Sequence, residues 1–431
     1  MKMQTKVAHV KGKAPAHWAD LDPQERRARI QELGYPAFRA DQLSRHYFEH
    51  HSIDPSSMTD LPSSMAEDIR THIFPPLLEK VTDLWADEGR TLKSVWRAVD
   101  GALIETVLMQ YPDRTTLCVS SQSGCGMACP FCATGQAGLT RNLSGGEIAE
   151  QVRLAMVCAQ SGKLAGGSTR VSNVVFMGMG EPLANWKNVR SALHRIIEPA
   201  PSGFGISARG VTVSTVGMVP LINKLADEGF PVRLAISLHA PDDELRDRLI
   251  PLNARFKVDQ ILDAARDYFR KTGRRVSVEY ALIKDINDHR WRAQLLADKL
   301  NARGRGWVHV NPIPLNPTPG SIWTASSAKV QDTFVQTLRL AGITTTIRDT
   351  RGSDIDGACG QLAYDMPVRS ARSQHAVQAV EDYLRAQKVA HPNMRAAWAK
   401  FVSPASERRH DQDQHVAYRY SYSDSHSEPA S

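Results

Sequence analysis

Long apolar runs are absent from this sequence of 431 residues: none approaches the eighteen or so apolar residues that a membrane-spanning helix needs. Residues 1–13 are polar and basic, so they also lack the apolar segment of a secretory signal. Hydrophobic residues make up 42% and charged residues 23% of the chain, which excludes collagen-like and wholly disordered proteins. We therefore expect a cytoplasmic protein without a membrane partner.

Cysteine is also scarce, with six residues in the whole chain, so a disulfide scaffold is excluded. The distribution of the six is uneven. Three lie within eight residues of one another (Cys125, Cys129 and Cys132), and three stand apart (Cys118, Cys158 and Cys359). In a reducing cytosol such a cluster indicates metal binding or catalysis.

Residues 1–80 are expected to form a helical module. Asp22, Pro23 and Glu25 are typical of a helix start, with a cap residue, proline at the first helical position and a carboxylate two residues later. Further helices are expected over 39–50 and 64–73. The module is interpreted as an accessory to the larger part of the chain that follows.

Residues 81–112 are expected to contain a β-hairpin. Two strands, 94–99 and 102–109, flank Asp100-Gly101, which is a strong two-residue turn signal. On the second strand Glu105 interrupts a row of apolar residues that share one face. The pattern alone leaves open whether that face is buried or meets solvent.

From residue 113 to about 370 short apolar runs alternate with longer helical stretches, such as 144–159, where Ser144 and Glu147 form a capping box. This alternation predicts an α/β fold with a parallel sheet, either a barrel or an open doubly wound sheet. In both, functional residues gather after the carboxyl ends of the strands. The expected strands are 115–120, 171–177, 211–215, 232–238, 276–283, 307–313 and 343–348.

The end of the chain is expected to differ from the rest. Residues 371–404 are predicted to be a helical segment. Residues 405–431 consist largely of Ser, His, Asp, Arg and Tyr, and have too few aliphatic residues to offset the entropy of ordering. We therefore predict a disordered tail.

The clustered cysteines form a C-x3-C-x2-C motif. Three thiolates on one tight loop can bind three corners of a [4Fe–4S] cubane and leave one iron without a protein ligand. A structural zinc site needs four protein ligands, and electron-transfer clusters normally have four cysteines. The motif therefore indicates a cluster whose open iron binds a substrate. A zinc site completed by Cys118 or Cys158 is the alternative.

This spacing resembles the radical S-adenosylmethionine superfamily. Within it, the chain is similar over about residues 20–370 to the RNA adenosine C2-methyltransferases that modify 23S rRNA and tRNA. The motifs that carry the resemblance are Ser121-Gln-Ser-Gly-Cys125, Cys132-Ala-Thr-Gly135, Arg141-Asn-Leu143, Met177-Gly-Met-Gly-Glu-Pro182, Val213-Ser-Thr215, Ser237-Leu-His-Ala-Pro241, Asn316-Pro317 and Ala358-Cys-Gly-Gln-Leu362.

The resemblance implies a partial (β/α)6 radical SAM barrel over 113–370, preceded by an RNA-binding accessory domain and the β-hairpin extension. It implies one [4Fe–4S] cluster held by Cys125, Cys129 and Cys132, and S-adenosylmethionine as cofactor, two molecules per turnover. The implied cofactor contacts are Gly180, Glu181, Ser214, Ser237, Leu238, His239 and Asn316.

The implied activity is methylation of C2 of one adenosine in the 23S peptidyl-transferase centre and of the adenosine 3′ to the anticodon in certain tRNAs. By resemblance, Cys359 carries the methyl group, Cys118 forms a transient disulfide with Cys359, and Glu105 is the base that removes the C2 proton. The implied partners are 23S rRNA, tRNA and an electron donor such as flavodoxin or ferredoxin, with the protein acting as a monomer.

Two other functions stay open at this point. One is methylation of C8 of the same rRNA adenosine with the same cysteines. The other is a non-catalytic RNA-binding iron–sulfur protein. The net charge of +7 permits RNA binding without arguing for it. Short basic clusters at Arg274, Arg275, Arg303 and Arg305 fit either phosphate contacts or an ordinary solvated face.

Overall fold

The computed structural model describes residues 12, 14–316, 318, 323–348, 351–363, 378–383 and 385. The expected tail at 405–431 and Pro317 lie outside the described residues. Of the expected helix at 371–404, residues 378–383 and 385 are described and are helical. Among the described helices, none combines the length and the apolar character that crossing a bilayer requires.

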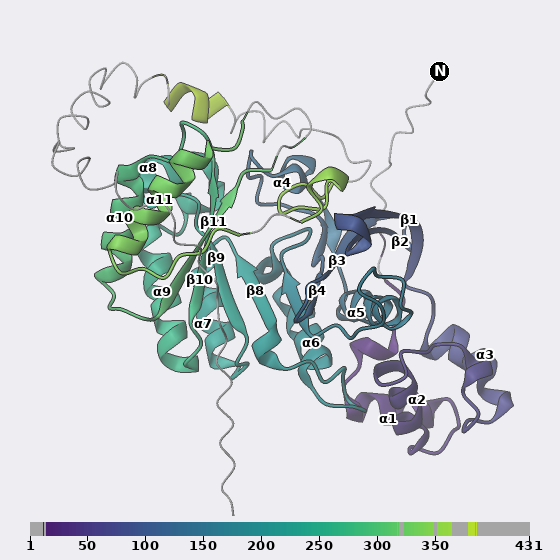
Figure 1. Ribbon diagram of the computed structural model, residues 1–431. Coiled ribbons are helices and arrows are strands. Elements are labelled where there is room, and N and C mark those ends of the chain that lie inside the picture. The colour runs from purple at the N-terminus through teal and green to yellow at the C-terminus, as the bar shows by residue number, and fades with distance from the viewer. Residues whose placement is uncertain are drawn as a thin grey trace, which may run out of the picture. The chain divides into compact units, whose positions relative to one another are not determined.

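The first part of the described chain is a helical module with its own apolar core (Figure 1). Asp22 caps α1 and forms a capping box with Glu25, as expected. The helix expected over 64–73 is broken into a 3-10 turn, one α-turn and a π-turn. The module's elements are η1 (Trp18–Asp20), α1 (Pro23–Glu32), α2 (Arg39–Phe48), η2 (Pro55–Ser57), η3 (Ser63–Met65), α3 (Ala66–Asp68) and η4 (Ile69–Ile73).

A nine-stranded sheet forms the centre of the larger part, in the order β1-β2-β3-β4-β7-β8-β9-β10-β11. Strands β1, β2 and β3 are antiparallel to their neighbours. The other six strands of this sheet, β4, β7, β8, β9, β10 and β11, are parallel to one another. The predicted partial (β/α)6 barrel and its hairpin extension are therefore confirmed. The strands are β1 (Leu78–Ala86), β2 (Thr91–Ala98), β3 (Leu103–Gln110), β4 (Thr115–Cys118), β7 (Asn173–Phe176), β8 (Val211–Thr215), β9 (Arg233–Ser237), β10 (Val276–Leu282) and β11 (Val308–Pro314).

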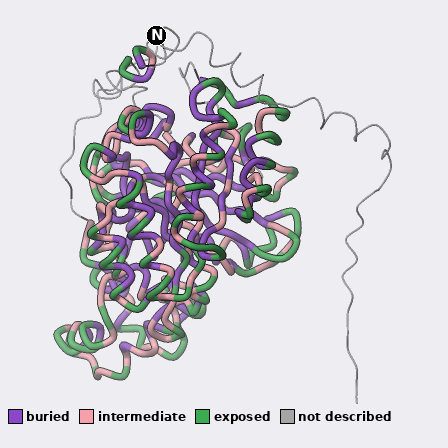
Figure 2. Tube along the Cα trace, turned by 90° about the vertical axis from the view of Figure 1, so that its left-hand side faces the viewer, coloured by how far each residue is buried: buried purple, intermediate pink, exposed green. Residues whose placement is uncertain are grey.

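Helices cover the sheet and bury its apolar side chains, so buried residues gather at the centre of the molecule (Figure 2). The capping box of Ser144 and Glu147 starts α5 as predicted, and Ile148 and Val152 on its inner stripe are fully buried. The helices are α4 (Ala133–Ala137), α5 (Gly145–Gln160), α6 (Trp186–Ile197), α7 (Val219–Asp227), α8 (Asp243–Leu249), α9 (Val258–Thr272), α10 (Arg290–Asn301) and α11 (Ala328–Leu340), with short 3-10 turns η5 (Asp87–Gly89), η6 (Pro182–Asn185), η7 (Ala208–Gly210), η8 (Pro251–Ala254) and η9 (Ser353–Ile355).

The structure differs from the expected strands in three places. The segment expected to be a strand at 343–348 is not a regular strand: it runs beside β11 and makes one bridge, from Thr345 to Val310. Strand β1 was not expected, because its charged and half-exposed residues show no clean alternation. The small sheet of β5 (Gln122–Gly124) and β6 (Leu139–Asn142), on either side of the cysteine loop, was not expected either.

Candidate active site

All the expected site residues except Glu105 and Leu238 line one or both of two adjoining hollows at the carboxyl ends of the parallel strands. The three clustered cysteines line the larger one, here called the large cavity, together with Glu181 and His239. Cys118 lines the smaller one, here called the small pocket. Cys359 lines both, and so lies in the wall between them. The other residues common to the two linings are Met177, Ile313, Asn316, Arg348 and Leu362.

The cysteine loop is shaped by close backbone packing. Gly124 has φ of 74°, and a Cβ there would lie 2.0 Å from the carbonyl oxygen of Gly138, so no larger residue fits. The backbone N–H of Cys125 donates to that same carbonyl at 2.8 Å. Cys132 follows on the turn that enters α4. The two strands β5 and β6 thus fix both ends of the loop.

Burial raises the pKa of all three thiols of this loop, and backbone hydrogen bonds to Cys125 and Cys132 oppose it. Burial raises the pKa of Cys125 to about 12, against backbone N–H groups of Met127 and Glu181 that favour its thiolate. Burial also raises the pKa of Cys132, and backbone donors from Thr134 and Gly135 oppose it. A bound metal deprotonates such thiols, and the same N–H groups then stabilise the thiolate sulfurs. The donor set therefore fits an iron–sulfur cluster.

The spacing of the cysteines favours a cluster over zinc. Among the residues that the structure describes, no group of three His, Cys, Asp or Glu side chains could hold a single metal ion. A cubane binds each thiolate at a different iron, so its ligands need not converge on one point. Cys118 lies in the small pocket, and Cys158 lies on α5 outside both hollows. Neither is placed as a fourth ligand of a zinc ion.

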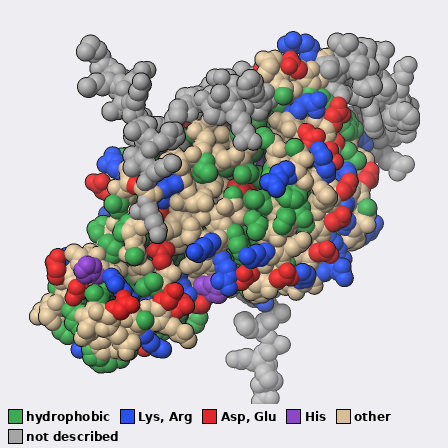
Figure 3. All heavy atoms as spheres, turned by 180° about the vertical axis from the view of Figure 1, so that it is seen from behind, with side chains coloured by type: hydrophobic (Ala, Val, Ile, Leu, Met, Phe, Trp, Pro, Cys, Tyr) green, Lys and Arg blue, Asp and Glu red, His purple; other side chains and the backbone are tan. Residues whose placement is uncertain are grey.

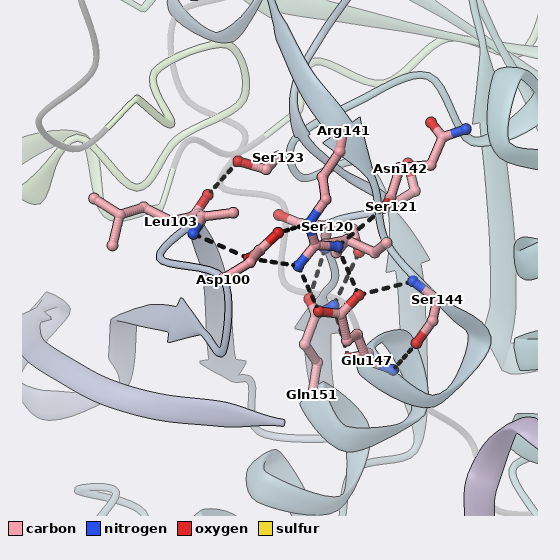
Figure 4. Close-up of polar contacts among 12 residues, drawn as sticks. Asp100, Leu103, Ser120, Ser121, Ser123, Arg141, Asn142, Ser144, Glu147 and Gln151 are labelled. Atoms are coloured by element: carbon pink, nitrogen blue, oxygen red, sulfur yellow. Dashed lines mark hydrogen bonds and ion pairs between the residues drawn. The ribbon is translucent and has the colours of Figure 1, made fainter. Parts of the chain in front are cut away.

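Arg141 ties the cysteine loop to the rest of the fold (Figure 4). From the end of β6 its guanidinium reaches Asp100 in the hairpin turn, at 2.5 and 2.9 Å, and Glu147 in the first turn of α5, at 2.7 and 2.9 Å. Glu147 also accepts the N–H of Ser144 as part of the capping box. All three charged side chains are at most 14% exposed. One guanidinium therefore joins the hairpin, the loop and the helix.

Replacing Arg141 with alanine should destabilise the fold by about 3 kcal/mol, because it leaves two buried carboxylates without their cation. Urea unfolding measures this change. Arg190→Ala is the matched control: Arg190 pairs with Glu228 on the surface, with 45% of the Arg190 side chain exposed, and its loss should cost less than about 1 kcal/mol. Equal losses of unfolding free energy in the two variants would show that the buried contacts of Arg141 stabilise the fold no more than a surface ion pair does.

Most of the expected cofactor contacts line the large cavity. Gly180, with φ of 101°, is packed so closely that a Cβ would lie 2.5 Å from Gln122, which leaves its backbone open to a ligand. Ser214 and Ser237 face each other with 3.2 Å between their hydroxyl oxygens. Asn316 donates to the carbonyl of Cys359 at 3.1 Å, so it also fixes that loop. Leu238 is the exception, because its side chain is fully buried in the apolar core.

Two titratable groups of the large cavity have pKa values shifted by burial. Burial raises the pKa of Glu181 to about 7, although its carboxylate accepts the backbone N–H groups of Leu183 and Val216. Burial and the nearby Arg246 lower the pKa of His239 to about 3. His239 Nδ1 accepts the N–H of Ala281 at 2.9 Å, so the proton of the neutral ring is on Nε2. A cationic ligand, such as an ammonium group, would favour the ionised form of Glu181.

Glu105 is not at a sheet edge. Strand β3 lies between β2 and β4, and Glu105 is only 1% exposed. Its surroundings are less apolar than the strand pattern suggested, because Lys93 Nζ lies 2.9 Å from Glu105 Oε2. Lys93 also donates to the carbonyl of Asp356 at 3.2 Å, in the loop that leads to Cys359. The lysine therefore connects the expected base to the loop of the expected methyl carrier.

Three charged residues of the site were missed from the sequence: Lys93, Glu279 and Arg348. Glu279 and Arg348 line the large cavity, and Arg348 also lines the small pocket. For Lys93, the visible signal was a lysine close to the apolar residues Leu92, Val95 and Trp96. Glu279 likewise interrupts the apolar residues of β10 and is 4% exposed. Nothing in the local sequence marked Arg348, because the segment that carries it is not a regular strand.

The expected basic clusters are partly neutralised. Arg303 pairs with Asp259 and Asp263, at 3.0 and 2.7 Å, so it belongs to an ion-pair network on the outer helices. Acidic and basic side chains are interspersed on the face seen in Figure 3. For Arg303 these ion pairs favour the solvated charged face. Arg274 and Arg275 lie directly before β10, at the opposite end of the sheet from the site.

Comparison with known proteins identifies the class and then the family. Residues 119–295 match the family model of the Radical SAM superfamily. The crystal structure of a radical SAM methyltransferase from Sphaerobacter thermophilus matches with a TM-score of 0.76 and 44% identity, over 80% of this chain and 99% of that chain. With three cysteines lining a cavity at the carboxyl ends of six parallel strands, these matches define a radical SAM protein.

Curated relatives narrow the class. The chain is 62% identical over 356 residues to the probable dual-specificity RNA methyltransferase RlmN of Kocuria rhizophila, covering 82% of this chain and 93% of the relative. It is also 62% identical over 353 residues to the protein of the same name from Kineococcus radiotolerans, covering 82% of this chain and 90% of the relative. The chain therefore belongs to the RlmN family of dual-specificity RNA methyltransferases.

Proposed function

We propose that this protein methylates C2 of one adenosine in the peptidyl-transferase centre of 23S rRNA and of the adenosine 3′ to the anticodon in certain tRNAs. The observation that carries the proposal is the position of Cys359. It lies in the wall between the large cavity, which the three clustered cysteines line, and the small pocket, which Cys118 lines. A group carried on the Cys359 sulfur can face either side.

The cluster and its cofactor would supply two things when bound in the large cavity: a methyl group for Cys359, and a 5′-deoxyadenosyl radical that activates this methyl group. The residues that would hold them are Cys125, Cys129 and Cys132 for the cluster, and Gly180, Glu181, Ser214, Ser237, His239 and Asn316 for S-adenosylmethionine. Leu238 would contribute through its backbone only.

The protein's own residues would then carry the methyl group to RNA. After the methyl group on Cys359 has given one hydrogen atom to the 5′-deoxyadenosyl radical, its carbon would bond to C2 of the flipped-out adenine and join the Cys359 sulfur to the RNA. Glu105 would remove the proton from C2, and the unpaired electron of the adduct would return to the cluster. Cys118 attacks the Cys359 sulfur: the S–S bond forms, the bond from Cys359 to the methylene carbon breaks, and that carbon keeps the electron pair and takes up a proton. The two cysteines are thereby oxidised to a disulfide, and methylated RNA leaves.

Replacing Glu105 with glutamine should stop turnover while leaving the methylation of Cys359 intact. General-base catalysis contributes about 10²- to 10⁴-fold, so RNA methylation should fall by at least about 100-fold. Intact-mass measurement reads the methyl group on the protein, and nucleoside analysis reads the RNA. A variant that methylates RNA at the normal rate would remove Glu105 from the mechanism. If the variant folds but Cys359 is not methylated, Glu105 is needed for methylation of Cys359 and not only for removal of the C2 proton.

Methylation of C8 of the same rRNA adenosine is the nearest alternative, since the same cysteines could serve it. The deciding experiment uses rRNA and tRNA from a strain that lacks the gene, incubated with the anaerobically reconstituted protein. Mass spectrometry of the nucleosides should show 2-methyladenosine in both RNAs. Formation of 8-methyladenosine alone would reject the C2 proposal. No methylated adenosine in either RNA would favour a non-catalytic RNA-binding protein.

A further inference from the structure

Arg348 is the cation common to the two hollows of the site. Its backbone N–H donates to the carbonyl of Pro312, which holds the segment beside β11. One guanidinium nitrogen lies 3.2 Å from the sulfur of Met177 and 3.6 Å from a carboxylate oxygen of Glu279. The distance to Glu279 is longer than a usual hydrogen bond. The carboxylate therefore attracts the guanidinium without forming a close ion pair with it.

Glu279 itself is firmly held. Its other carboxylate oxygen accepts the hydroxyl of Ser277 at 2.5 Å and the amide of Asn311 at 3.0 Å. The carboxylate is therefore a fixed point on β10 against which Arg348 can be oriented. It also attracts the guanidinium away from any other anion in the same cavity.

Arg348, Cys118 and Cys359 all line the small pocket, so the guanidinium lies on the same hollow as both thiols. The pKa of Arg348 is raised, first by Cys359, then by Glu279, Cys118 and Tyr111, against the opposing effect of burial. Burial raises the pKa of Cys118 to about 12, and Arg348 is the cation that opposes this rise. A buried thiol is a poor nucleophile until it loses its proton, and a nearby guanidinium favours that loss.

The other charged or titratable groups around these thiols do not replace Arg348. Cys132 lines the large cavity together with Cys359, and like Cys359 it carries charge only as an anion. Arg351 lines only the small pocket, where its guanidinium lies over the ring of Tyr111 at 5.2 Å. Lys93 is bound to Glu105 and to the carbonyl of Asp356.

We propose that Arg348 is a positioning residue that stabilises the two thiolates in turn, Cys359 while it accepts the methyl group and Cys118 while it attacks the Cys359 sulfur. The proposal rests on the proposed function. In the first step a bond forms between the Cys359 sulfur and the methyl carbon, the bond from that carbon to the sulfonium breaks, and the charge of the thiolate is lost. Cys359 is then an uncharged thioether, so the guanidinium is released to Cys118.

The test compares Arg348→Gln, Arg348→Lys and Glu279→Gln in the full chain with its cluster reconstituted anaerobically. The probe is iodoacetamide at a fixed near-neutral pH, and peptide mass spectrometry measures the alkylation rate of Cys359. Loss of the cation should slow alkylation about tenfold, because the Cys359 thiolate loses the positive charge that stabilises it. Lysine should restore most of the rate. Glu279→Gln should accelerate alkylation, because it removes the competing carboxylate.

Alkylation needs neither RNA nor methyl transfer, so its result is separate from the success of the proposed function. Cluster absorbance and thermal unfolding show which variants are folded. A folded Arg348→Gln protein that is alkylated at the normal rate would overturn the proposal. If Arg348→Gln does not fold, the Glu279→Gln variant decides. Alkylation of Cys359 at or below the normal rate in that variant would also overturn the proposal.

The second half of the proposal has its own measurement. In a single turnover, the covalent protein–RNA adduct should last about tenfold longer in Arg348→Gln than in the unaltered protein, because Cys118 is then slow to lose its proton. Arg348→Lys should shorten this lifetime again. If Arg348→Gln releases RNA from the adduct at the normal rate, the guanidinium does not stabilise the Cys118 thiolate. Its role would then be limited to Cys359.

Discussion

Replacing Cys359 with alanine should abolish RNA methylation while the iron–sulfur cluster stays in place. Loss of a covalent nucleophile leaves no alternative carrier for the methyl group, so the rate should fall by at least about a thousandfold. Cys359 lines the large cavity but lies outside the loop of the three clustered cysteines. The cluster's visible absorbance should therefore be unchanged, which an anaerobic spectrum measures directly.

The matched control is Cys158→Ala. Cys158 is a half-buried free thiol on α5, away from both hollows, so this variant should keep activity and absorbance alike. If Cys359→Ala loses the absorbance, Cys359 is a cluster ligand and the assignment of the methyl carrier is wrong. If it still methylates RNA, no protein-bound methyl group is needed.

Replacing Cys118 with alanine should trap the protein on its RNA. Cys118 and Cys359 line the same small pocket as free thiols, so the geometry allows a disulfide to form between them once the adduct is made. Without Cys118 the bond from the Cys359 sulfur to the RNA has no attacking thiolate, and the adduct should accumulate to a large fraction of the protein. Denaturing electrophoresis followed by mass spectrometry measures it.

The double variant Cys118→Ala with Cys359→Ala controls for this experiment, since it has no sulfur to carry the RNA. It should show no adduct. A Cys118→Ala protein that turns over normally, or that stalls without any adduct, would remove the resolving role from Cys118. Another thiol or water would then have to release the product.

Local sequence signals predicted much of the framework of the site. The capping boxes of α1 and α5, the Asp100-Gly101 turn and the strands before the cysteine loop depend on neighbours a few residues apart, and the structure has all of them. Strand β1 escaped prediction because it is half exposed, so its sequence lacks the alternation that marks a buried face.

Contacts between distant segments could not be predicted in this way. Lys93 and Glu105 are on neighbouring strands, but the approach of Lys93 to Asp356 joins residues 263 positions apart. Arg348 reaches Met177 across 171 positions, from an irregular segment that runs beside β11. The apolar row of β3 marked Glu105 as unusual, whereas the approach of Arg348 to Glu279 became visible only in three dimensions.

The central claim is that the loop of Cys125, Cys129 and Cys132 leaves one iron of a cluster free to cleave S-adenosylmethionine for RNA methylation. The most direct measurement follows 5′-deoxyadenosine and methylated adenosine together, in anaerobic reactions of the reconstituted protein with RNA, S-adenosylmethionine and a strong reductant. The account predicts that both products appear in step and that both are lost when any one of the three cysteines is replaced. Methylated RNA without 5′-deoxyadenosine, or neither product from a protein with an intact cluster, would contradict it.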